Sequence, residues 1–182
     1  MGKWFKRLFL SFIVLIVVLA VALWGLLAYI APDEQLDLNY DSVDIRGKAL
    51  EMAKSLKLEL VLTEQDINNL IKKRLERDIA DHVVLDGARF ELQGDRLIAH
   101  LNVTYMELVS AQMKVEYRLE WQEPSLALRP QGLFVKGFEL PDHSLETIIV
   151  PLDLPTGEIV SVKEVQFEDG QVRVLFRAKL PF

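Results

Sequence analysis

The residue types of a hydrolase triad occur together in the run Asp142-His143-Ser144. Side chains of immediate chain neighbours cannot converge in the geometry that such a triad requires, so we interpret this run as a coincidence. Two Ser-x-Lys pairs, Ser55 with Lys57 and Ser161 with Lys163, place a hydroxyl near an amine. On strands the two members of each pair would share the solvent face, where the lysine lacks the desolvation that activates a nucleophile.

The three histidines, His82, His100 and His143, are each solitary in the sequence. His100 falls beside Asn102 on the polar side of an alternating stretch, where we expect a solvated side chain and no metal. The chain has no cysteine, which excludes a thiol nucleophile, a Cys-ligated metal centre and a disulfide scaffold. Phosphate-binding loops, calcium loops and zinc-protease motifs do not occur in the sequence. We therefore predict that the protein is not an enzyme and needs no cofactor.

One segment of the chain predicts a membrane span. Leu8 to Ala31 carries no charge, and as a helix it would extend about 36 Å against a hydrocarbon core of about 30 Å. Lys3, Lys6 and Arg7 precede it and acidic residues follow it, so the positive-inside rule places the N-terminus in the cytoplasm. The alternative is a signal peptide cleaved near Ala20-Val21-Ala22, which would leave an apolar stretch at the new terminus. Both interpretations place the following domain outside the cytoplasm.

Beyond the span the chain is acidic. Without the three cations that precede the span, 18 Lys and Arg stand against 27 Asp and Glu, a net charge of −9. Such a surface does not favour a nucleic acid, and we expect no nucleic-acid partner. The predicted organisation is a cytoplasmic stub and transmembrane helix at 1–31, a linker at 32–41 and an extracytoplasmic α+β domain at 42–182.

The external domain changes from helical to strand periodicity along the chain. Two amphipathic helices are predicted, from Ser42 to about Leu56 and from Thr63 to about Ala80, the second with Thr63 as its N-cap. Alternating leucines at 56–62 predict a strand between them. From Val83 onward the pattern predicts strands joined by tight turns, with one helical turn near 145–149. Together with the strand at 56–62, seven or eight strands are expected. Pro124 and Pro130 bracket one short strand, and the alternation slips at Lys163-Glu164, where we expect a β-bulge.

The most informative strand runs from Val109 to Trp121. Apolar and polar residues alternate without a fault along it, and in extended form it would span about 43 Å. Two short helices cover only part of so long an apolar face. We therefore predict an α+β fold in which an N-terminal transmembrane helix precedes a curled antiparallel β-meander packed on one or two amphipathic helices. The side chains expected to line an apolar channel, or else to form a closed core, are Leu101, Val103, Tyr105, Met113, Val115, Tyr117 and Leu119.

Two short motifs support a resemblance to a known family. Leu-Thr-Glu-Gln-Asp-Ile-Asn at Leu62–Asn68 opens a helix, and Val-Lys-Gly-Phe-Glu-Leu-Pro stands at Val135–Pro141 in the strand region. With the membrane helix ahead of them, these parts resemble the YpmS family of membrane-anchored extracytoplasmic proteins of Gram-positive bacteria, which has no assigned biochemical activity. Asn68, Gly137 and Pro141 match that pattern, and we interpret all three as structural.

The order of a helix followed by a curled sheet is also similar to the tubular lipid-binding superfamily, in which a sheet wraps a helix and leaves a channel for acyl chains. This resemblance implies a bound lipid and no cofactor, although a fold alone does not fix a function. Two hypotheses follow. The chain is either a membrane-tethered module of the bacterial cell envelope that binds or hands over a lipid, or a membrane-anchored scaffold that docks on an envelope enzyme or wall-synthesis complex. The expected partners are the lipid bilayer, an acyl-chain ligand and a membrane protein.

Overall fold

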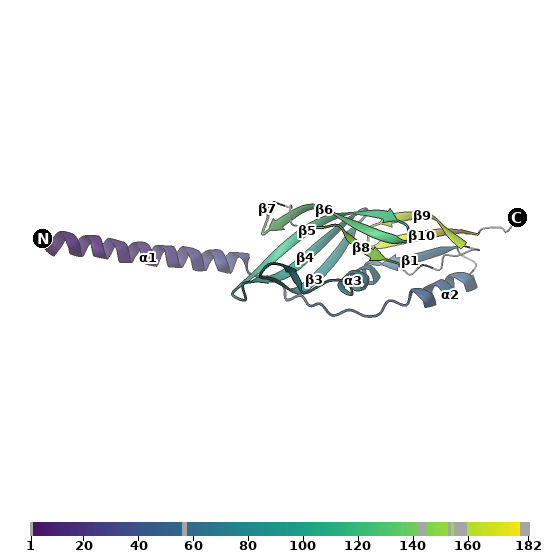
Figure 1. Cartoon of the computed structure of the whole chain (residues 1–182), viewed down its shortest axis with the longest axis horizontal. Coiled ribbons are helices and arrows are strands. Elements are labelled where there is room, and N and C mark those ends of the chain that lie inside the picture. The colour runs from purple at the N-terminus through teal and green to yellow at the C-terminus, as the bar shows by residue number, and fades with distance from the viewer. Residues whose placement is uncertain (1, 56–57, 142–144, 153, 155–159, 179–182) are drawn as a thin grey trace.

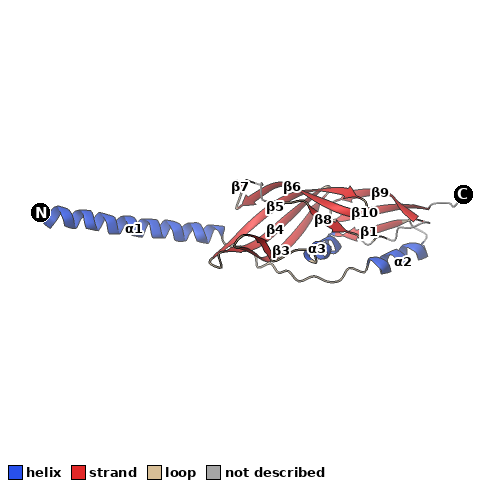
Figure 2. Cartoon of the chain, in the orientation of Figure 1, coloured by secondary structure: helices blue, strands red, loops and turns tan. Residues whose placement is uncertain are grey.

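The protein's structure is a computed structural model that describes residues 2–55, 58–141, 145–152, 154 and 160–178. A long N-terminal helix precedes a curled antiparallel sheet, a smaller antiparallel sheet and two short helices (Figure 1 and Figure 2). The predicted α+β class, with an apolar helix ahead of a curled antiparallel sheet, is confirmed. The runs Asp142-His143-Ser144 and Ser55 to Lys57 reach outside the described residues.

The first helix, α1 (Gly2–Ile30), projects away from the rest of the chain as one rod (Figure 1). Its stretch Trp4–Ile30 is long and apolar enough to cross a membrane, and its most apolar part is not buried by the domain. Within this stretch the hydroxyl of Ser11 donates a hydrogen bond to the carbonyl oxygen of Leu8 (2.8 Å), so this polar side chain is satisfied inside the helix. The helix is compatible with a single-pass membrane anchor.

The large sheet is antiparallel, and its strands follow one another in the order β2-β3-β4-β5-β6-β7, with β8 paired to β6. The predicted long strand is present as β5, and the register of β4 against β5 is unbroken. Val83, Tyr105 and Val109 are in register at the end of the sheet nearest α1, here called the proximal end, and Gln93 and Arg96 pair at the distal end. The bounds are β2 (Asp78–Ala80), β3 (Val83–Gln93), β4 (Arg96–Tyr105), β5 (Val109–Gln122), β6 (Ser125–Val135), β7 (Phe138–Leu140) and β8 (Ile148–Pro151).

Two local expectations for this sheet are wrong. Pro130 was expected to end a strand, but β6 continues through it. The register against β5 shifts between Glu116 and Tyr117, so the irregular pairing at this point does not require the N–H that proline lacks. A helical turn was expected near 145–149, yet β8 pairs with residues 125–128 of β6. Long-range pairing with an open strand edge outweighs the weak local pattern there. The described part of the chain contains ten strands, more than the seven or eight expected.

The small sheet joins distant parts of the chain in the order β1-β10-β9. β1 (Glu59–Thr63) pairs with β10 (Gln171–Ala178), which forms a hairpin with β9 (Val160–Glu168). The register of this hairpin shifts so that Lys163 has no partner, which confirms the bulge predicted from the slip in alternation at Lys163-Glu164.

The two short helices lie beneath the sheets (Figure 1), α2 at Ile45–Ser55 and α3 at Glu64–Lys72. Thr63 caps α3 as predicted: its hydroxyl accepts from the N–H of Asp66, and the Asp66 carboxylate accepts from the N–H of Thr63 (2.8 Å). Partial burial opposes ionisation of Asp66, but hydrogen bonds from Thr63 and Lys48 outweigh it and hold the pKa of this carboxyl below its ordinary value.

The prediction that the second helix continues to about Ala80 is wrong. α3 ends at Lys72, and residues 78–80 form the edge strand β2 instead. The reason is pairing: Asp78 lies opposite Val84 and Ala80 opposite Val83, so this stretch gains ladder hydrogen bonds from β3 that a helix would not use. The apolar stripe read as helical is therefore divided between α3 and the chain that follows it.

The core occupies the distal half of the domain. There the inner faces of both sheets meet α3, and buried Leu60, Leu62, Ile71, Leu97 and Val174 belong to one apolar cluster. Along the inner face of β4, Leu97 and Ala99 lie in this cluster, whereas Val103 is buried outside it and Tyr105 at the proximal end is 45 % exposed. The inner face of the large sheet is therefore covered at one end and open at the other.

Candidate functional site: an apolar groove at the end of the N-terminal helix

The open part of the sheet forms a groove with a volume of about 700 Å³. Its floor is the inner face of β3, β4, β5 and β6. One lip is formed by residues of the segment 75–80, and the other by Leu140, Leu145, Glu146 and Ile148. Nearly every described side chain on its wall is apolar or a tyrosine. Glu146, which is exposed, also lines the groove and carries an acidic group. At the proximal end the wall includes Ile30, the last residue of α1.

The structure brings five of the seven predicted channel residues together on the groove wall: Leu101, Val103, Tyr105, Met113 and Tyr117. The other two, Val115 and Leu119, share the same face of β5 but do not line the groove and belong to the closed core. The predicted set is therefore divided between the proximal groove and the distal core, and Tyr117, which lines the groove and is only 5 % exposed, belongs to both.

Several wall residues come from segments that the sequence analysis did not connect with the channel. Leu75 and Ile79 had been assigned to the stripe of a longer helix, and Ile30 to the membrane span. Val135 is the last residue of β6 and lies opposite Met113 of β5, and Leu145 lies ahead of β8. The alternation at Leu133 and Val135 would have indicated part of this set, but no sequence pattern links Ile30 to the domain.

Burial of Tyr117 in the deep part of the groove raises the pKa of its hydroxyl to about 12. This residue is therefore neutral at physiological pH, and the deep groove offers no charge to a ligand. Among the described residues, no three His, Asp or Glu side chains converge as metal ligands. His100 lies on the outer face with its Nε2 atom 3.5 Å from the Glu91 carboxylate. The described wall of the groove can take up apolar chains.

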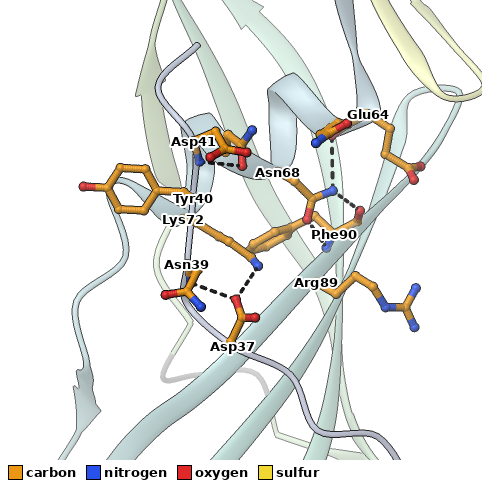
Figure 3. A pocket seen from close by; sticks show the side chains of 11 residues that line it. Asp37, Asn39, Tyr40, Asp41, Glu64, Asn68, Lys72, Arg89 and Phe90 are labelled. Carbon is orange, nitrogen blue, oxygen red and sulfur yellow. Dashed lines mark hydrogen bonds and ion pairs between the residues drawn. The ribbon is translucent and has the colours of Figure 1, made fainter.

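A second, polar pocket of about 460 Å³ lies between α3 and the segment that follows α1 (Figure 3). Several of its polar groups pair with one another. Asp37 accepts from the N–H of Asn39 (2.8 Å) and lies 3.5 Å from the ammonium of Lys72. The hydrogen bond from Asn39, supported by Lys72, lowers the pKa of Asp37. The backbone N–H of Asp41 donates to the side chain of Asn69 (3.2 Å).

Asn68 reaches β3 from the same pocket (Figure 3). Its side-chain oxygen accepts from the N–H of Phe90 (2.8 Å), and its amide donates to the carbonyl oxygens of Phe90 and Glu64. The Glu64 carboxylate accepts from the N–H of Leu92 (2.8 Å). These bonds satisfy backbone groups on the edge of β3 that no strand covers, so the structural interpretation of Asn68 agrees with its contacts.

The segment 32–41, expected to be a linker, is held against the domain; we call it the strap. Lys136 pairs with Asp33, and the side chain of Asn102 donates to the carbonyl oxygen of Glu34 (2.6 Å). Further on, the strap passes so close to Gly87 that a Cβ there would lie 2.1 Å from the carbonyl oxygen of Leu36. The strap crosses the outer face of the sheet, and its contacts fix the domain relative to the end of α1.

Comparison with protein-family models, with curated proteins and with solved structures finds no match for this chain. The resemblances to the YpmS family and to tubular lipid-binding domains therefore stay predictions.

Proposed function

We propose that the chain is a membrane-tethered, non-catalytic module of the bacterial cell envelope that binds the acyl chain of a lipid and hands it on. The observation that carries the proposal is the apolar groove whose wall begins at Ile30, the last residue of the apolar helix. A groove in this position would meet lipid at the bilayer surface without any movement of the domain. No cofactor is part of the proposal.

The size of the groove suits one acyl chain. At about 30 Å³ for a water-sized group, 700 Å³ holds about 20 such groups, close to the length of a long acyl chain. Each methylene removed from water contributes about 0.8 kcal/mol. The wall is apolar throughout its depth, so a polar headgroup would remain at the open side.

The orientation part of the proposal rests on charge. Lys3, Lys6 and Arg7 precede the apolar run, whereas Asp33 and Glu34 follow it. Positive residues flanking a span favour the cytoplasmic side. The N-terminus is then cytoplasmic and the domain extracytoplasmic, next to the lipids of the outer surface.

The test uses the full chain reconstituted in liposomes that contain a phospholipid with a photoactivatable acyl chain. After irradiation and proteolysis, mass spectrometry maps the lipid adducts along the sequence. We expect adducts on α1 and, in addition, on the groove strands β4 and β5. Adducts on α1 alone would overturn the proposal and would favour the other hypothesis, a membrane-anchored scaffold for an envelope enzyme. The α1 adducts serve as the internal control for lipid access.

A further inference from the structure

Exposed apolar side chains gather at the proximal end of the large sheet. Leu108 is 85 % exposed, Phe138 68 % and Met106 50 %, and the groove residues Ile79 and Tyr105 stand beside them with partial exposure. The turns at the distal end, residues 93–96 and 122–125, expose no large apolar side chain. The proximal turns of the large sheet therefore expose large apolar side chains that these two distal turns lack.

The turn between β4 and β5 presents its apolar side chains at a conformational cost. The N–H of Leu108 donates to the carbonyl oxygen of Tyr105 (3.1 Å), and the two residues between them have positive φ, 50° for Met106 and 58° for Glu107. Hairpin turns of this kind favour Asn-Gly, because Met and Glu have a Cβ that opposes positive φ. Met106 and the nearly fully exposed Leu108 do not stabilise the fold of an isolated domain, so they do not offset the strain of the turn.

A second turn at the same end contacts the helix. Between β6 and β7, Lys136 and Gly137 also have positive φ, and Phe138 follows them. The carbonyl oxygen of Lys136 accepts a hydrogen bond from the hydroxyl of Tyr29 near the end of α1 (3.4 Å). Tyrosine near the end of a membrane span favours the headgroup layer, which places this turn at the same level.

We propose that these two turns, defined as the proximal tip (residues 105–108 and 136–138), insert their apolar side chains into the outer leaflet beside α1. The occupant is the lipid bilayer, since the tip is continuous with the end of the helix that is anchored in it. Glu107 lies between the two apolar residues of its turn, so the insertion reaches the headgroup and upper acyl region and no deeper. The groove then opens into the leaflet itself.

This proposal rests on the anchorage of α1 that is part of the proposed function, but it does not need lipid in the groove. The two fail separately. Lipid adducts on the inner strands report the groove, whereas the environment of Leu108 on the turn reports the tip.

The chain has no cysteine, so a single introduced thiol can be labelled with an environment-sensitive fluorophore. Two full-length variants are compared in nanodiscs of phosphatidylethanolamine and phosphatidylglycerol, Leu108→Cys at the tip and Asp169→Cys in the exposed distal turn between β9 and β10. We expect a blue-shifted emission and quenching by lipids spin-labelled near the top of the acyl chain for the Leu108→Cys label. The Asp169→Cys label should show neither effect.

Equal, weak quenching of both labels would overturn the proposal, as would a blue shift of the Leu108→Cys label without lipid quenching, which indicates a protein contact instead. Because a label at Leu108 alters the turn, Phe138→Cys provides a second position with the same expected result. If the tip is exposed to water, the emission of the labels at both tip positions is not quenched. A tip in the leaflet predicts quenching at both.

Discussion

Blocking the groove at its open part should remove lipid from the sheet while leaving the anchor in place. Ala111 lies on the groove wall, opposite Val103 in the β4–β5 register, and its side chain is half-buried. The variant Ala111→Trp adds an indole that protrudes into the groove. Ser110→Trp places the same group on the outer face of the same strand and is the matched control.

The magnitude follows from the space that is lost. The indole adds about nine heavy atoms, close to half of the roughly 20 groups that the groove holds. A chain displaced from the groove returns to a bilayer that is equally apolar, so the loss is set by the space removed and not by burial from water. The remaining space holds about half of the acyl chain, so we expect the lipid adducts on β4 and β5 to decrease to about half of the wild-type value or less.

The assay is the photo-adduct map of the reconstituted full chain, expressed as adducts on β4 and β5 relative to adducts on α1. Ala111→Trp should reduce this ratio sharply, and Ser110→Trp should leave it near the wild-type value. Circular dichroism checks folding, and Met113→Trp supplies a second blocking position on the same wall if the first variant does not fold. An unchanged ratio in a folded blocking variant would refute the groove as the lipid site.

Three further predictions concern the parts that hold the groove in place. Gly87→Ala forces a Cβ against the backbone of Leu36, so thermal unfolding should show a loss of about 1–3 kcal/mol and proteolysis should cut the strap sooner than in the wild type. Asn68→Ala leaves the N–H and carbonyl groups of Phe90 without their partner, and denaturant unfolding should record a loss of about 1–3 kcal/mol for each group left unsatisfied. The pKa of Asp66 is lowered in the folded state, so its ionised form stabilises the fold at pH values above the unfolded-state pKa near 3.8, and this stability is lost as the pH falls through the folded-state pKa. The variant Asp66→Asn should therefore flatten the acid limb of a curve of unfolding free energy against pH. An unchanged acid limb would contradict the role of the capping box.

The strands that the sequence predicts well are those in which one face is buried along the whole length. The alternating burial of β5 and the bulge at Lys163 are both present in the structure. A shift of the strand register by one residue would expose every apolar side chain of the strand, so the pattern of apolar residues determines the register. Residues 78–80 and 148–149 were assigned to helix, since a short apolar stretch has no period long enough to tell a helix from a strand. Their strand state comes from partners far along the chain.

The groove was only partly predictable for the same reason. The pattern of β4 and β5 identifies which side chains face inward, but it does not tell a covered position such as Val115 from an open one such as Met113. That difference depends on how far the small sheet and α3 extend over the large sheet. The strap was not foreseen either, because its contacts at Gly87 and Asn102 join an acidic segment without periodicity to the outer face of two strands.

The position of the groove also limits which role the proposed lipid binding can have. An acyl chain that enters from the bilayer leaves surroundings as apolar as those it reaches, so the burial energy that favours binding from water largely cancels. The wall adds no ion pair in its depth, where Tyr117 is neutral, and Glu146 at the lip offers no attraction to an anionic headgroup. Occupancy would then be set by exchange with a concentrated lipid phase, with fast entry and fast release past Ile30. Such a groove is suited to passing a lipid on to a partner that binds it more tightly, and poorly suited to storing it.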